Sequence, residues 1–279
     1  MYRSTSRSRI SIAVAAAVAI SAMLTVDPAA QAPRPLAPAY RAPRTADGKP
    51  DLNGIWQALN TANWNLQDHS ASQGPFEFGA MFSIPGGVGV VDGKEIPYKP
   101  EMLAKKKENA ANWTKLDPEL KCYMPGVPRA TYMPYPFQIV QTPTQILMAY
   151  EFASAVRTIY MVDHQEAPND FWMGWSNGHW EGDTLVVDVT GLMPNTWFDR
   201  AGNFHSDALH VVERYTRTGP DHLTYEATIE DVNVFTRPWK ISMPLYRRLD
   251  TNAQLVEYKC IEFAEELMYG HLRRQPVNP

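Results

Sequence analysis

The sequence predicts a mostly β fold, an antiparallel up-and-down meander of strands that closes into a barrel. Short runs of alternating apolar and polar residues recur from residue 137 onward, and turn-forming residues separate them. In the clearest run, Leu223–Glu230, every second side chain is apolar, which is typical of a half-buried antiparallel strand. Successive hairpins without intervening helices favour a meander, and a meander of about eight to ten strands removes its exposed edges by closing.

Turn chemistry bounds the predicted strands. Residues that favour hairpin turns occur at 142–144 (Thr-Pro-Thr), 181–183 (Glu-Gly-Asp) and 219–221 (Gly-Pro-Asp). A first strand is expected to begin at Gly54. The other strands are expected at Phe137–Gln141, Gln145–Glu151, Val156–Val162, Trp175–Trp180, Thr184–Thr190, Leu209–Thr218, Leu223–Glu230, Trp239–Leu249 and Gln254–Cys260.

Residues 1–32 are predicted to be a signal peptide. Three arginines precede an apolar run, Ile10–Val26, and Ala-Gln-Ala at 30–32 matches the small-x-small pattern of a cleavage site. We therefore expect a periplasmic or secreted protein without membrane contact after cleavage. The alternative is an uncleaved anchor, since the apolar run is close to the shortest length that spans a membrane.

The rest of the chain is expected to hold one domain. Residues 33–50 are rich in proline and predict an extended linker, and residues 51–279 predict a single β-barrel domain. An insertion at about residues 60–120 interrupts the strand pattern with loops and a helix at Lys99–Trp113. A second, closing helix is predicted at Glu262–Arg273.

Composition bears on two questions, whether the protein binds nucleic acid and whether its cysteines are oxidised. The full chain carries a net charge of −4, and the signal peptide takes away three arginines but only one aspartate. Because basic patches interleaved with aromatic residues are missing from the sequence, nucleic acid is not expected as a partner. Cys122 and Cys260 are the two cysteines, and an exported chain can join them in a disulfide. Two buried free thiols are the alternative.

Four phrases together suggest a relationship. They are PDLNGIW at 50–56, PGVPR at 125–129, GHWEGDTLVVD at 178–188 and TRPW at 236–239. With them the chain resembles a group of exported bacterial β-rich proteins, known mainly as hypothetical proteins, over most of residues 50–260. The Gly-x-Trp start and the meander also look like lipocalin-type barrels. That likeness implies a cavity for a small apolar ligand and, in a minority of cases, catalysis, but fold likeness alone does not assign a function.

The segment 171–214 concentrates the residues that carry chemistry. It holds four of the eight tryptophans and three of the seven histidines. His205, Asp207 and His210, with His179 as a further group, are the candidate catalytic residues, because imidazoles beside carboxylates exchange protons near neutral pH. Hydrogen bonding at the barrel rim is the alternative role. We expect no organic cofactor and predict no metal ligand, with a divalent metal as the alternative.

Aromatic and basic residues complete the candidate site. Trp175 and Trp197 are predicted to form a binding surface for a ring. Arg129 and Tyr132 lie in a proline-rich loop that can hold them over a cavity mouth. Arg214 is a further candidate for binding substrate, and ion pairing is the alternative for both arginines.

These observations lead to three functional hypotheses. The first is an exported enzyme that acts on a small ring-bearing organic substrate by His/carboxylate acid–base chemistry, as a lyase, isomerase or hydrolase, in a tryptophan-lined cavity. The second is a non-catalytic periplasmic protein of lipocalin-like type that binds or carries a small molecule. The third is a structural module of the envelope without a deep cavity. The substrate and the oligomeric state do not follow from the sequence.

Overall fold

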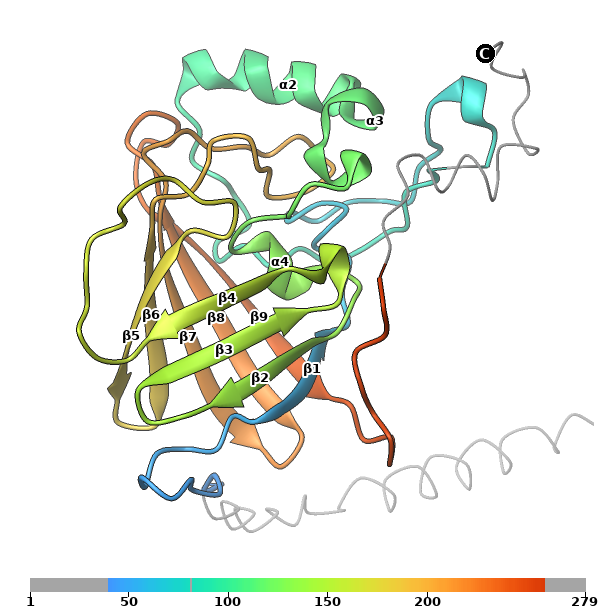
Figure 1. Cartoon of the computed structure of the whole chain (residues 1–279). Helices are drawn as coiled ribbons and strands as arrows, with labels where there is room; N and C mark the ends of the chain where they lie inside the picture. Colours follow the sequence, from blue (N-terminus) through green and yellow to red (C-terminus); the bar gives the residue numbers. More distant parts are fainter. Residues whose placement is uncertain (1–39, 81, 259–279) are drawn as a thin grey trace, which may run out of the picture. The chain divides into compact units, whose positions relative to one another are not determined.

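A computed structural model describes residues 40–80 and 82–258, and these form a closed barrel of nine strands (Figure 1). Neighbouring strands follow the order of the chain, and the first pairs with the last to close the barrel. The strands are β1 (Gly54–Ala58), β2 (Phe137–Gln141), β3 (Gln145–Tyr150), β4 (Val156–Tyr160), β5 (Trp175–Glu181), β6 (Thr184–Thr190), β7 (His210–Gly219), β8 (His222–Glu230) and β9 (Trp239–Arg247).

The barrel confirms the predicted fold class, and the alternation of side chains explains it. In β8, Leu223, Tyr225, Ala227 and Ile229 are fully buried, and the residues between them are partly exposed. The same pattern fills the interior from neighbouring strands, because successive side chains of a strand point to opposite faces. A one-residue slip in pairing would turn these apolar side chains to solvent, which makes the register strongly determined.

One strand pair departs from the predicted antiparallel meander. β4 and β5 are parallel and share only two paired positions, Ile159 with Ser176 and Tyr160 with Asn177. Residues 161–174 carry the chain between the two strands and let β5 start beside the middle of β4. A parallel pair needs such a crossover, since a two-residue hairpin can join only antiparallel strands. The barrel is therefore mixed rather than purely antiparallel.

The insertion lies between β1 and β2. It contains η1 (Phe76–Phe78), η2 (Pro100–Met102), α2 (Leu103–Ala111), α3 (Trp113–Leu116), η3 (Pro118–Lys121) and α4 (Arg129–Tyr132), and a further short turn, η4 (Phe152–Ser154), joins β3 to β4. The helix expected at Lys99–Trp113 is thus present, with Pro100 in its first turn and a break at Asn112. Figure 1 shows α2 and α3 beyond one end of the barrel and α4 close to that end.

A buried ionic network anchors the insertion. Arg129 of α4 donates to both carboxylate oxygens of Asp117, at 2.8 and 2.9 Å, to Glu119 at 2.7 Å and to Asn63 at 2.8 Å. Arg200 donates two further bonds of 2.8 Å to Glu119. Burial raises the pKa of Asp117 despite its arginine partner, whereas Arg200 and Arg129 outweigh burial at Glu119 and lower its pKa to about 2.

Several predictions concern other parts of the chain. Residues 254–258 form no strand, so the strand expected at Gln254–Cys260 is wrong over this described part. The predicted signal peptide at 1–32 and the helix at Glu262–Arg273 lie outside the described residues. The described end of the expected linker, residues 40–50, makes a turn in which Thr45 and Lys49 are hydrogen-bonded, and Arg44 binds Asp183.

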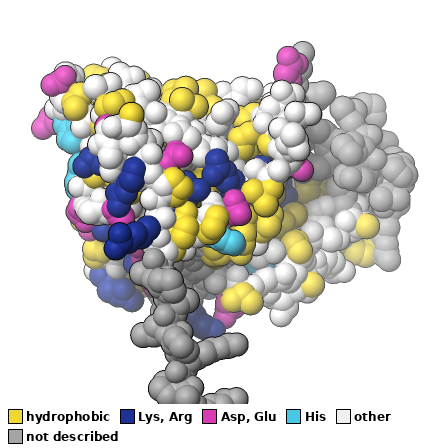
Figure 2. Space-filling model, turned by 90° about the horizontal axis from the view of Figure 1, so that it is seen from below, with side chains coloured by type: hydrophobic (Ala, Val, Ile, Leu, Met, Phe, Trp, Pro, Cys, Tyr) yellow, Lys and Arg dark blue, Asp and Glu magenta, His cyan; other side chains and the backbone are white. Residues whose placement is uncertain are grey.

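The described part of the chain has a mixed surface. Basic, acidic and hydrophobic side chains lie interspersed on the face that Figure 2 shows. No helix within residues 40–80 and 82–258 combines the length and the apolar character needed to cross a bilayer.

Candidate ligand-binding site

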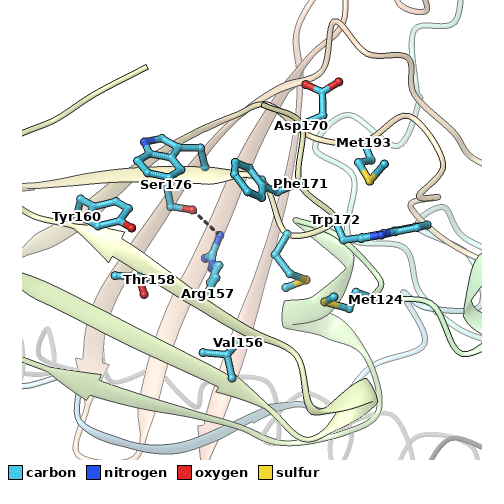
Figure 3. Close-up of a pocket in the computed structure, with 13 residues that line it drawn as sticks. Met124, Val156, Arg157, Thr158, Tyr160, Asp170, Phe171, Trp172, Ser176 and Met193 are labelled. Carbon is cyan, nitrogen blue, oxygen red and sulfur yellow. Dashed lines mark hydrogen bonds between the residues drawn. The ribbon is translucent and has the colours of Figure 1, made fainter. Parts of the chain in front are cut away.

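A pocket of about 340 Å³ opens in the barrel wall where β4 and β5 begin to separate (Figure 3). We call it the wall pocket. Aromatic rings and methionines make up much of its lining, and a few polar groups lie among them. Its lining residues are Met124, Val156, Arg157, Thr158, Tyr160, Asp170, Phe171, Trp172, Met173, Gly174, Trp175, Ser176 and Met193.

The parallel pairing of β4 and β5 creates this pocket. The strands are joined only at Ile159 and Tyr160 of β4, so the preceding residues of β4 have no partner on β5. Gly174, with a φ of +69°, turns the chain just before β5. On a regular strand, Trp172 and Trp175 would not both face inward. Because the turn at Gly174 separates them, both line the wall pocket.

The aromatic rings of the pocket support one another. Trp175 stacks on Tyr160 with 4.8 Å between ring centroids, and Phe171 lies 5.9 Å from Trp175. On the other side, Trp172 packs on Tyr123 at 5.1 Å. Such offset ring pairs hold large flat surfaces in place at low cost in conformational entropy. The pocket therefore presents preformed aromatic faces to a ligand.

Arg157 supplies the positively charged group of the pocket. It lies on β4 between outward-facing neighbours, and its side chain is only 2% exposed. Its Nη2 lies 2.7 Å from Oε2 of Glu213 and donates to the Tyr215 hydroxyl at 3.2 Å. Its Nη1 is 3.5 Å from the Ser176 hydroxyl, and Figure 3 shows these two side chains directed toward each other.

Glu213 is held inside the barrel by three groups. The hydroxyls of Tyr215 and Tyr225 donate to its Oε1, at 2.9 and 2.8 Å, and Arg157 binds Oε2. Burial alone would lower the pKa of Arg157, but the Glu213 carboxylate raises it well above its usual value. The guanidinium therefore remains charged, and Glu213, Tyr215 and Tyr225 form a buried hydrogen-bonded group behind the pocket.

The structure does not bring the predicted catalytic residues together. His205 is buried, with Nε2 2.7 Å from the Thr196 hydroxyl and Nδ1 2.8 Å from the Ser206 carbonyl. Burial lowers the pKa of His205. Asp207 is exposed in the loop that follows. His205 lies in the loop before β7 and is buried there, whereas His210 is the first residue of β7.

His210 and His179 lie on the outer face of the barrel. His210 Nε2 is 2.8 Å from Asp188, and its Nδ1 is 3.6 Å from Glu230. His179 is half exposed and lies 3.3 Å from Glu181. Neither histidine lines the wall pocket. The Asp188 side chain that contacts His210 is itself 47% exposed.

The predicted binding residues divide in the same way. Trp175 lines the wall pocket, whereas Trp197 is buried beside Phe204. Arg129 is occupied by its carboxylate partners, and the Tyr132 hydroxyl donates to the carbonyl of Phe198 at 2.8 Å. Arg214 pairs with Glu181 at 2.9 Å on the outer face. None of the predicted binding residues other than Trp175 lines the wall pocket: three are buried in the packed structure, and Arg214 forms an ion pair on the surface.

Cofactor and disulfide predictions stay open. Within residues 40–80 and 82–258, no group of three or more His, Cys, Asp or Glu side chains is arranged to hold a metal ion. Cys122 ends η3 in a left-handed conformation, with a φ of 62°. Cys260 lies outside the described residues, so the predicted disulfide stays a prediction.

Sequence reasoning missed much of the pocket. Tyr160, Phe171, Asp170 and the three methionines were not candidates, because no periodic pattern marks residues that meet across a gap between strands. Arg157 did carry a signal: an arginine inside a predicted strand must find a partner or an anion if it points inward. No protein-family model and no curated protein matches this chain, so the resemblance to exported β-rich proteins stays a prediction.

Proposed function

We propose that the protein binds a small ring-bearing organic molecule in the wall pocket. The observation that carries this proposal is the lining: four aromatic side chains and three methionines around one buried guanidinium. Small-molecule sites are typically concave and mostly apolar, with a few polar groups that orient the ligand. Methionines adapt their shape to different apolar partners, which suits a binding protein.

The size of the pocket limits the ligand. A volume of about 340 Å³ lies near the lower end of the range for small-molecule sites. A compact molecule of one to three aromatic rings fits this space better than a long lipid or a polymer. We also propose, from the predicted signal peptide alone, that binding takes place in the periplasm or outside the cell.

A fluorescent ring compound tests the proposal. N-phenyl-1-naphthylamine is uncharged, and its emission rises in apolar surroundings. We expect saturable binding, a roughly tenfold weaker affinity in Trp175→Ala, and an unchanged affinity in Tyr246→Ala. Tyr246 is a suitable control because it packs on His222 across the β8–β9 pair, away from the pocket. Emission that does not saturate, or an equal loss of affinity in both variants, would contradict the proposal.

Acid–base catalysis at His210 is the second candidate function. Asp188 is hydrogen-bonded to one nitrogen of His210, and Glu230, near the other, lines a separate surface pocket with Lys99 and Arg237. A carboxylate that orients an imidazole is a common arrangement for proton transfer. Turnover of an aromatic ester or ketone that His210→Asn abolishes would support this function as a hydrolase, isomerase or lyase. Turnover that survives the substitution would exclude His210.

A further inference from the structure

Arg157 has more hydrogen-bond donors than the protein satisfies. A guanidinium carries five N–H groups, and the two on Nη2 have Glu213, Tyr215 and the Met148 sulfur within reach. Nη1 is 3.5 Å from the Ser176 hydroxyl, which is the outer limit for a hydrogen bond, and the Tyr150 hydroxyl also interacts with the guanidinium. Nε is buried without a partner among the described residues. A buried cationic donor without an acceptor is costly, so this arrangement favours a ligand that brings one.

The charges around the pocket oppose an anionic ligand. Glu213 already neutralises Arg157 at 2.7 Å, and both side chains are almost completely buried. The Asp170 carboxylate lines the pocket itself, and Figure 3 shows it at the end of the pocket away from Val156. A ligand carboxylate would be the third negative charge near one cation, and it would also lose its hydration. An uncharged oxygen accepts from the free donors without either cost.

From these two observations we propose that the ligand is an uncharged aromatic carbonyl compound. Its ring lies among Tyr160, Phe171, Trp172 and Trp175, and its carbonyl oxygen accepts hydrogen bonds from Arg157 and Ser176. Aromatic ketones, amides, esters and quinones share this chemistry. The inference rests on the proposed function, because it names the ligand class of the same pocket.

Three naphthalene compounds of nearly equal shape test the inference. They are 2-acetonaphthone, 2-isopropenylnaphthalene, in which CH₂ replaces the carbonyl oxygen, and 2-naphthoate. Affinities are measured by calorimetry or ligand-observed NMR at pH 7.5, where 2-naphthoate is ionised. We expect the ketone to bind about tenfold more tightly than the hydrocarbon, and naphthoate to bind more weakly than the ketone.

The outcomes separate the two proposals. Equal binding of hydrocarbon and ketone, or tightest binding of naphthoate, keeps the wall pocket as a ring site and overturns the inference about the carbonyl. Binding of none of the three, together with no binding of N-phenyl-1-naphthylamine, overturns the proposed function as well.

A double variant links the preference to Arg157. Arg157→Met alone would leave Glu213 buried without its partner and is expected to unfold the barrel. Arg157→Met with Glu213→Gln removes both charges and keeps side-chain volume. In this variant we expect the ketone and the hydrocarbon to bind equally, with hydrocarbon affinity unchanged. A preserved tenfold preference would overturn the assignment to Arg157, and the wild-type comparison decides the ligand class even if the variant does not fold.

Discussion

Replacing Arg129 with methionine tests whether this residue is structural or belongs to a binding site. The side chain is 2% exposed and makes four hydrogen bonds, to Asn63, Asp117 and Glu119. In Arg129→Met, Glu119 keeps its two bonds from Arg200, but Asp117 keeps only the backbone N–H of Glu119. Breaking a buried ion pair costs about 3–5 kcal/mol, and we expect this loss in the free energy of unfolding.

Urea unfolding, followed by circular dichroism, measures the loss. The control is Arg44→Met, which breaks an exposed pair with Asp183 and should cost about 0–1 kcal/mol. Adding Asp117→Asn to Arg129→Met removes the unpaired carboxylate and should restore part of the lost stability. A loss in Arg129→Met no larger than in Arg44→Met would refute the reasoning, as would weaker binding in the wall pocket without a change in stability.

Three further predictions concern the turn, a buried histidine and the barrel interior. Gly174→Ala should lower the unfolding free energy by about 1–3 kcal/mol and weaken ring binding, because the added Cβ would lie 2.7 Å from a side chain of β6. The control is Gly182→Ala, in which the added Cβ has no atom within 4 Å, and this variant should lose only about 1 kcal/mol. Because burial lowers the pKa of His205 below 6.5, the unfolded chain binds more protons as the pH falls. Stability should therefore decrease below pH 6.5, and His205→Asn should reduce that decrease in urea titrations at pH 7.5 and 5. Tyr225→Phe removes a hydroxyl that donates to Glu213 and should lower the unfolding free energy by about 1–3 kcal/mol in the same assay. An unchanged unfolding free energy would mean that this hydrogen bond does not stabilise Glu213.

The strands were predictable because their signal is local. The alternation of apolar and polar residues in Thr184–Thr190 and Leu223–Glu230 predicts a strand with one buried face. The structure has both strands at nearly those bounds. The parallel pairing of β4 and β5 has no such signal. It depends on the path of residues 161–174, and the sequence of that segment does not indicate which strand β5 will meet.

Proximity along the chain was a poor guide to the site. His205 and His210 are five residues apart, but one is buried and the other faces outward from β7. Conversely, Met124 and Met193 are 69 residues apart in sequence and line one pocket. Arg129 shows a similar limit: its proline-rich surroundings suggested a cavity mouth, whereas its carboxylate partners hold it in the interior.

The sequence by itself determined that this chain is a β-barrel, because hydrophobic alternation and turn residues act over a few neighbouring positions. It also determined that segment 171–214 is rich in aromatic and titratable groups. Only the tertiary structure decided which of these meet. A pocket depends on the pairing of strands and on the direction of each side chain, and both are properties of the closed barrel rather than of any single segment. For that reason the wall pocket, lined by Arg157, Trp172 and Trp175, exists only through the parallel pairing of β4 with β5.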